Sequence, residues 1–174
     1  MMNRRHALMG LALAGAAQGV VQGTAVAQTG AARTLSGTEH TAKTLMAGTL
    51  AKQTSELALQ RGQHQKVKQF AHFEIAEQTA MAQVLTDVAN PPAVPLDAGH
   101  EAVLKSLQSL SGPAFDRAYV QGQIQGHEEL LLVQQGYLAD HNRSTDGQHI
   151  AVLARMVIQQ HLTMLQELQQ MLAA

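Results

Sequence analysis

The segment SGPAFDRAYVQGQIQGHEELLLVQQGYL, residues 111–138, decides the fold class because it has the pattern of one long amphipathic helix. Pro113 is tolerated in the first turn of a helix, and Asp116 is expected to face the positive end of the helix dipole. His127 lies between two neighbouring apolar rows, so its imidazole is expected to face the interior. The rows are Phe115, Tyr119, Leu130, Val133 and Tyr137, and then Val120, Ile124, Leu131 and Leu138.

Further helical patterns flank this segment on both sides. One covers residues 41–61, and a second covers residues 65–89 and stops before Pro91, since proline cannot continue a helix. A short helix is expected over residues 97–110, and the last helix follows a loop after residue 138 and runs to the C-terminus. Two helical hairpins joined by a crossover predict an all-α fold, a four-helix bundle with a short crossover helix between the hairpins.

The first 27 residues have the pattern of an export signal. Arg4 and Arg5 supply the positive start, a mildly apolar stretch follows, and the small residues 25–27 suit a cleavage site. The paired arginines resemble a twin-arginine signal, and an ordinary secretory signal is the alternative. We expect residues 28–40 to form a flexible linker, residues 41–174 to form the bundle domain, and the protein to be periplasmic.

Composition limits the function classes. The chain has 174 residues, is 45% hydrophobic and 3% aromatic, contains no cysteine, and carries a formal charge of −1. Stability must therefore come from an aliphatic helical core rather than from disulfides. Nucleic-acid binding is not expected, because there is no basic block. We also expect no transmembrane span in the mature chain.

Three helices each place one residue of a metal-ligand type within an apolar stripe. These are Glu74 on the second long helix, His127 on the third and His161 on the fourth, with Glu77 one turn beyond Glu74. Carboxylate and imidazole suit Fe, Mn or Zn, so these residues are candidate ligands of a metal site. A Glu–His pair that bridges helices without metal explains the same residues more simply. The stripes are Val67, Phe70, Ala71, Met81, Leu85 and Val88, and then Ile150, Ala154, Val157, Leu165, Leu168 and Leu172.

The first long helix offers no inward acid in its expected stripe of Met46, Leu50, Thr54 and Leu57. Di-iron carboxylate bundles place Glu-x-x-His on two helices, and no long helix here carries that motif. A mononuclear site is therefore the most that this set of residues predicts.

The phrases GPAFDRAY and GHE in residues 112–128, together with VKQFAHFEIAEQ in residues 67–78, resemble a bacterial exported family, domain of unknown function 4142. Its members are commonly labelled predicted outer-membrane proteins and assigned a ferritin-like four-helix bundle, so the resemblance implies that fold. Asp116, His127 and His161 match the family pattern. The chain departs from it at Glu74, commonly Met, at Glu77–Gln78, usually Asp-His, and on the first helix, where Ala51 and Gln53 stand in place of acids.

Two functions remain open from the sequence. The first is a non-enzymatic binding or interaction module, whose partner would be a second copy or an envelope protein. Leu132, Val152 and Met156 support it, because they point away from the core stripes; the alternative is that the crossover helix covers them. The second is a mononuclear metal-binding or redox protein. No catalytic residue is expected, since cysteine, a G-x-S-x-G elbow and a phosphate-binding loop are all absent.

Overall fold

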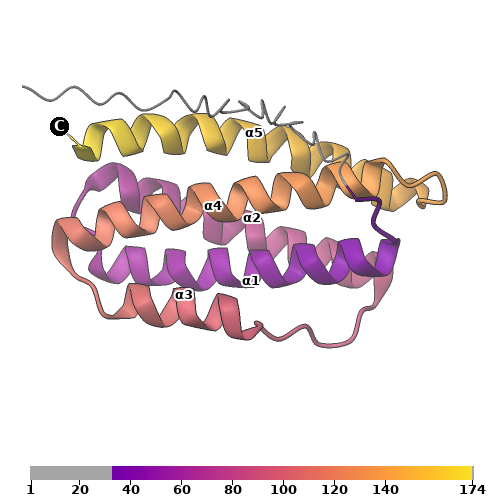
Figure 1. Cartoon of the computed structure of the whole chain (residues 1–174), viewed down its shortest axis with the longest axis horizontal. Coiled ribbons are helices and arrows are strands. Elements are labelled where there is room, and N and C mark those ends of the chain that lie inside the picture. Colours follow the sequence, from indigo (N-terminus) through magenta and orange to yellow (C-terminus); the bar gives the residue numbers. More distant parts are fainter. Residues whose placement is uncertain (1–32, 174) are drawn as a thin grey trace, which may run out of the picture. The chain divides into compact units, whose positions relative to one another are not determined.

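The computed structural model describes residues 33–173, which contain five α-helices and no strand. Helices α1 and α2 form one antiparallel hairpin, α4 and α5 form the second, and α3 lies in the crossover between them (Figure 1). The prediction of an all-α bundle with a short crossover helix is confirmed. The bounds are Gly37–Arg61 for α1, Gln65–Ala89 for α2, Ala98–Gln108 for α3, Gly112–Leu138 for α4 and Thr145–Ala173 for α5.

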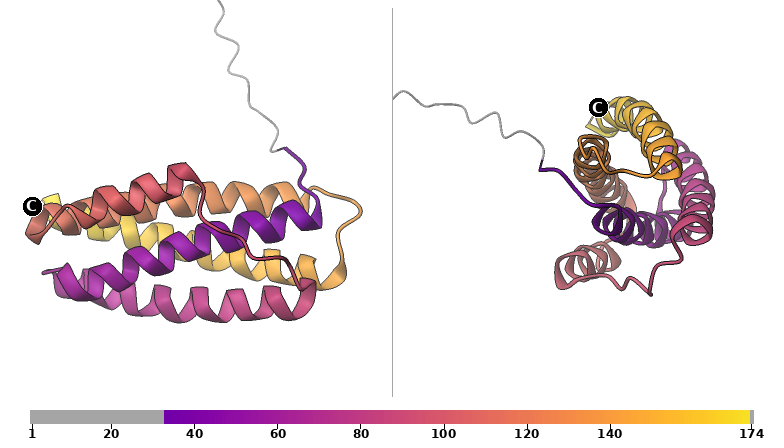
Figure 2. Two further views of the ribbon diagram at one scale, coloured as in Figure 1. Left: turned by 90° about the horizontal axis from the view of Figure 1, so that it is seen from below. Right: turned by 90° about the vertical axis from the view of Figure 1, so that its right-hand side faces the viewer.

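The four long helices surround a common core, and α3 lies outside them against α1 and α4 (Figure 2). Because the crossover runs back along the bundle, α4 is antiparallel to both α1 and α5 (Figure 1). None of the helices that the structure describes combines the length and the apolar composition that a membrane crossing requires.

Helix α1 begins at Gly37, four residues before the expected start. Ser36 caps it: the Ser36 hydroxyl accepts the backbone N–H of Glu39 at 3.3 Å, and the Glu39 carboxylate accepts the backbone N–H of Ser36 at 3.0 Å. Leu35 is buried and donates its backbone N–H to the carbonyl of Gly136 at 3.1 Å. Residues 35–40, expected in the linker, therefore belong to the folded bundle. Residues 28–32 of the expected linker and the expected export signal, residues 1–27, lie outside the described residues.

The inward face of α1 is polar and small, which differs from the expected apolar stripe. Thr54 is the buried member of that stripe, while Met46, Leu50 and Leu57 are half-buried. The stripe on α2 also ends early, since Val88 is 46% exposed. The residues of α1 that are buried are His40, Thr41, Thr44, Gly48, Thr54, Ser55 and Ala58.

Hydrogen bonds join this polar face to α4. The His40 imidazole Nε2 lies 2.6 Å from Gln134 Oε1, and the Gln134 amide donates to the Thr44 hydroxyl at 3.1 Å. Farther along, the Ser55 and Tyr119 hydroxyls are 2.8 Å apart. Burying polar groups is tolerated when each finds a partner, so specific hydrogen bonds set the register of α1 against α4.

Asp116 has a different role from the one expected. It is 2% exposed, and its carboxylate accepts the backbone N–H groups of Gln63, at 3.1 and 3.2 Å, and of His64, at 2.8 Å. Instead of facing the dipole of its own helix, Asp116 fastens the loop between α1 and α2 to α4. The tight turn at Gly62 permits this contact, because a Cβ there would lie 2.6 Å from the Ala58 carbonyl oxygen.

Substitution of alanine for either of two glycines in α4 is expected to change the free energy of unfolding in opposite directions. A Cβ at Gly136 would lie 2.5 Å from the Arg33 carbonyl oxygen, whereas a Cβ at Gly122 meets no described atom within 4 Å. We expect Gly136→Ala to lower the free energy of unfolding by about 1–3 kcal/mol through overpacking. Gly122→Ala should raise it by up to about 1 kcal/mol through helix propensity. Urea unfolding measures both, and effects of the same sign would contradict the close approach of residues 33–35 to α4.

Candidate metal centre

Glu74 on α2, His127 on α4 and His161 on α5 meet in the core. Glu74 Oε2 lies 3.5 Å from His127 Nε2 and 3.2 Å from His161 Nδ1, and the two imidazole nitrogens are 3.1 Å apart. The residues are 0%, 3% and 7% exposed, respectively. The expectation that all three side chains point inward is confirmed, and residues from three helices place one potential ligand atom each in a single cluster.

The hydrogen bond of His127 to the backbone fixes which nitrogen can bind a cation. His127 Nδ1 lies 2.8 Å from the carbonyl oxygen of Gln123, one turn earlier in α4. A carbonyl only accepts, so Nδ1 carries a hydrogen, and in the neutral ring Nε2 carries the lone pair. That lone pair faces the Glu74 carboxylate. The cluster therefore needs a positive charge at its centre, either a proton or a metal ion.

Without metal, a protonated histidine compensates the charge of the buried carboxylate. Burial raises the pKa of Glu74, but interaction with the His127 and His161 imidazoles outweighs burial and brings this pKa to about 2. Burial lowers the pKa of His127, but the Glu74 carboxylate outweighs burial and raises it above 6.5. The metal-free centre is thus an ion pair between ionised Glu74 and protonated His127.

Neighbouring side chains orient the cluster from outside. Gln78 donates its amide N–H to Glu74 Oε1 at 2.9 Å, and Glu77 Oε2 lies 3.4 Å from His161 Nε2, on the far side of that ring. Burial raises the pKa of the Glu77 carboxyl, although the His161 ring opposes this. The Phe70 ring packs edge-on against His161 with 5.2 Å between centroids. A carboxylate behind a ligating histidine is a common feature of metal sites.

One atom of the cluster lacks a hydrogen bond. Glu74 Oε2 is the buried side-chain oxygen within residues 33–173 that has no hydrogen-bond partner, although two imidazole nitrogens lie 3.2 and 3.5 Å from it. Around a metal ion with 2.0–2.1 Å bonds, tetrahedral ligand atoms lie about 3.3 Å apart. The three separations of 3.1, 3.2 and 3.5 Å match this spacing. The donor set and its spacing therefore fit a metal ion.

The structure separates the expected site residues into different roles. Glu77, expected beside Glu74, contacts the outer nitrogen of His161 instead of joining the cluster. The sequence did not single out His40, which is buried and stacked on Tyr137 with 4.2 Å between centroids, because its position was assigned to the linker. The Ser36-x-x-Glu39 capping motif was the signal that a helix begins before His40.

The comparisons with known proteins place the chain in a family without an assigned activity. The model of the family described as Domain of unknown function (DUF4142) matches residues 22–168. The chain belongs to this family. No curated protein and no solved structure matches the chain. DUF4142 membership is consistent with the resemblance carried by residues 112–128, and the activity must be inferred from the site itself.

The Glu74–His127 pair is expected to stabilise the metal-free protein most between about pH 4.5 and 6.5. The pKa of Glu74 is lowered from 4.5 to about 2 on folding, so its contribution is present above pH 4.5 and is lost as the pH falls toward 2. The pKa of His127 is raised from 6.5, so its contribution is present below pH 6.5 and is lost as the pH rises through the raised value. A shift as large as that of Glu74 corresponds to a stability change on the order of 3 kcal/mol.

Urea unfolding in the presence of a chelator, repeated from pH 2 to pH 9, measures this profile. Glu74→Gln serves as the control, because it keeps the shape of the side chain and removes the charge. The variant should lose the contribution of the Glu74–His127 pair at both ends, while Glu39, Asp97 and His40, whose pKa values are also lowered on folding, keep theirs. A variant with the wild-type profile would show that the Glu74–histidine cluster does not control the pH dependence of stability.

Proposed function

We propose that this DUF4142 protein is a ferritin-like helical bundle that binds one divalent transition-metal ion through Glu74, His127 and His161. The observation that carries the proposal is the buried Glu74 Oε2 atom, which has no hydrogen-bond partner among the described residues and faces two imidazole nitrogens. Two imidazoles and one carboxylate form the ligand set of several zinc enzymes and of non-haem iron sites. Zn²⁺ and Fe²⁺ therefore fit best, with Mn²⁺ next.

Each surrounding contact supports a defined part of the proposal. The Gln123 carbonyl holds His127 in the tautomer that directs a lone pair inward, and Glu77 would accept the outer N–H of His161. Gln78 satisfies the Glu74 oxygen that faces away from the two rings. An ion held by three protein atoms keeps a coordination position for water or a ligand, where it acts as a Lewis acid.

Metal binding would replace the proton that the metal-free cluster holds. An imidazole must be neutral to ligate, so binding releases the proton that His127 carries in the ion pair with Glu74. The ion would then supply the positive charge that the buried carboxylate requires. Proton release on binding distinguishes this centre from histidines that bind metal at an exposed surface, where no buried ion pair is replaced.

Titration of the mature chain, residues 28–174 without a tag, with Zn²⁺ and anaerobically with Fe²⁺ tests the proposal. We expect one ion per chain, an affinity that falls below about pH 6.5, and proton release measured by calorimetry in two buffers of different ionisation enthalpy. His127→Ala and His161→Ala should each weaken binding at least 100-fold. Glu77→Gln should weaken it about 10- to 100-fold, as expected for a residue that orients a ligand.

His72→Ala is the matched control, because His72 lies exposed on α2 two residues from Glu74. Its metal affinity should equal that of the wild type, and circular dichroism verifies that every variant is folded. If the wild type binds no ion, or if His72→Ala loses as much affinity as His161→Ala, the metal proposal is wrong and the centre is a proton-bridged ion pair.

We further propose that the protein is exported, by the twin-arginine route, and functions in the periplasm. Support comes from the paired Arg4 and Arg5 and from the small-residue site at residues 25–27. The twin-arginine route carries folded proteins, so it would be compatible with insertion of the metal before export.

A second candidate function is association with another copy of the chain. The specific observation is the exposure of apolar side chains on α4 and α5. Leu132 is 59% exposed and Met156 49%, and α3 does not cover them. Large apolar side chains that stay exposed on neighbouring helices are typical of an interaction surface.

The double variant Leu132→Gln/Met156→Gln tests this candidate. We expect sedimentation of the wild type to show a dimer that the variant converts into a folded monomer. Met171, which is 49% exposed near the C-terminus, provides the control. The variant Met171→Gln should leave the dimer unchanged. A wild-type monomer at all concentrations would rule out self-association.

A further inference from the structure

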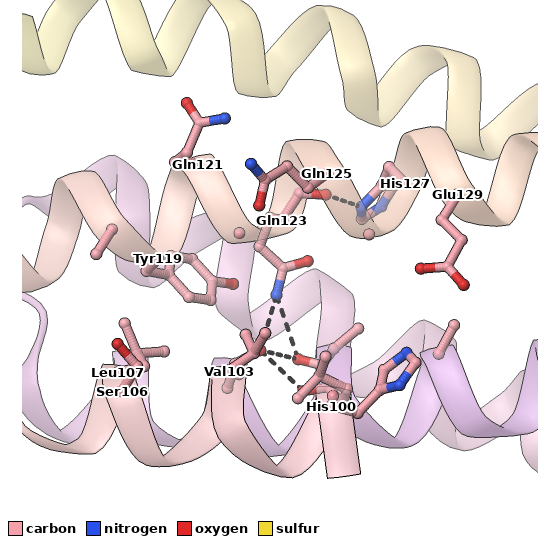
Figure 3. Close-up of a pocket in the computed structure, with 18 of the residues that line it drawn as sticks. His100, Val103, Ser106, Leu107, Tyr119, Gln121, Gln123, Gln125, His127 and Glu129 are labelled. Atoms are coloured by element: carbon pink, nitrogen blue, oxygen red, sulfur yellow. Dashed lines mark hydrogen bonds between the residues drawn. The ribbon is translucent and has the colours of Figure 1, made fainter. Parts of the chain in front are cut away.

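A pocket of about 780 Å³ lies between the crossover helix and the bundle (Figure 3). Helix α3 forms one wall with Val103 and Leu107, α1 contributes Leu50, and α4 contributes Leu130 along with glycines. A volume of this size lies in the range of sites for small molecules, and such sites are mostly apolar with a few placed polar groups.

The pocket exists because α4 lacks side chains where α3 passes over it. Gly122 and Gly126 both line the pocket, and a Cβ at either would meet no described atom within 4 Å. Leu107 near the end of α3 is 6% exposed, whereas Val103 in its middle is 46% exposed. Helix α3 therefore packs against the bundle near one of its ends and leaves open space over Gly122 and Gly126 of α4.

Polar groups in the pocket offer a hydrogen-bond acceptor at its inner wall. The Gln123 amide nitrogen donates to Thr54 Oγ1 at 3.0 Å and to the Ala51 carbonyl oxygen at 3.4 Å. This use of the nitrogen leaves the carbonyl oxygen of the same amide as the atom that a ligand can contact (Figure 3). The Tyr119 hydroxyl, by contrast, is already paired with Ser55.

The charges around the pocket restrict the ligand further. Among the described residues that line it there is no Lys or Arg, and the charge of protonated His127 is already paired with Glu74. Asp97 and Glu129 add further carboxylates. An anionic ligand such as a fatty acid would therefore find no free countercharge and would be repelled. Asp97 is engaged in capping α3, where it accepts the His100 N–H at 2.9 Å, so its carboxylate is not free to hold a cation.

We propose that this pocket binds an uncharged, mainly apolar small molecule that carries a hydrogen-bond donor for the Gln123 carbonyl oxygen. The apolar part of the ligand lies along Gly122 and Gly126 beneath α3. Glu74 and His127 close the inner end of the pocket. The inference does not depend on metal binding, because it rests on the space and the polarity of the pocket alone.

The probe N-phenyl-1-naphthylamine tests the proposal, since it is neutral and apolar, carries one N–H donor and fluoresces when it leaves water. Titration is done with metal-free protein in the presence of a chelator, so that failure of the metal proposal does not affect the result. We expect saturable binding of one probe per chain. Gly126→Leu should weaken it at least tenfold, because the new side chain fills the pocket without meeting a neighbour at its Cβ.

Ala80→Leu is the matched control, because it adds a leucine at an exposed position of α2 outside the pocket. It should bind the probe like the wild type. Gly126→Leu should retain the wild-type circular dichroism and unfold at equal or higher urea, since leucine has a higher helix propensity than glycine. Gly122→Leu provides a second pocket-filling variant with the same expectation.

Three outcomes of these titrations would overturn the proposal. Absence of probe binding to the wild type, or equal binding to Gly126→Leu, would show that the pocket holds no such ligand. Equal affinity for the anionic probe 1-anilinonaphthalene-8-sulfonate would refute the preference for uncharged ligands. A wild-type dimer that Gly126→Leu converts to a monomer would assign the pocket to a second copy of the chain.

Discussion

The Glu74 carboxylate is buried in the core and requires a positive charge beside it, and the rest of the structure depends on this constraint. An ionised carboxylate with no exposed surface is costly unless a cation and hydrogen bonds compensate it. Glu74 belongs to one helical hairpin and its two histidine partners belong to the other. Satisfying this one charge therefore fixes the rotation of α2, α4 and α5 about their axes, and so it ties the two hairpins together.

The interface between α1 and α4 follows a different physical rule. Its buried groups are hydroxyls, amides and an imidazole that find partners in one another, as His40 does with Gln134 and Ser55 does with Tyr119. Directional hydrogen bonds specify one register, where an apolar stripe would tolerate several. The Gln123 side chain belongs to this interface and its backbone carbonyl orients His127, so the polar interface and the candidate metal centre share one residue.

The periodicity of apolar residues and the positions of helix-breaking residues were sufficient to predict most of the architecture. Pro91 ends α2 because proline cannot continue a helix, and the spacing of three and four placed Glu74, His127 and His161 inside. The prediction was less accurate where local signals competed. The small residues before Ser36 suggested a linker, although the capping motif there begins α1, and the helical position of Asp116 suggested a dipole role, although its partners lie in a distant loop.

The sequence by itself determined the helices, the order in which they follow one another, and the inward faces of α2, α4 and α5, because these follow from local sterics and from a period of 3.6 residues. Only the tertiary structure decided which inward groups touch. It selected Glu74 rather than Glu77 for the cluster, directed a particular nitrogen of each histidine toward it, and left space above Gly122 and Gly126. Distances between helices arise from packing among residues far apart in the chain, which no local pattern records.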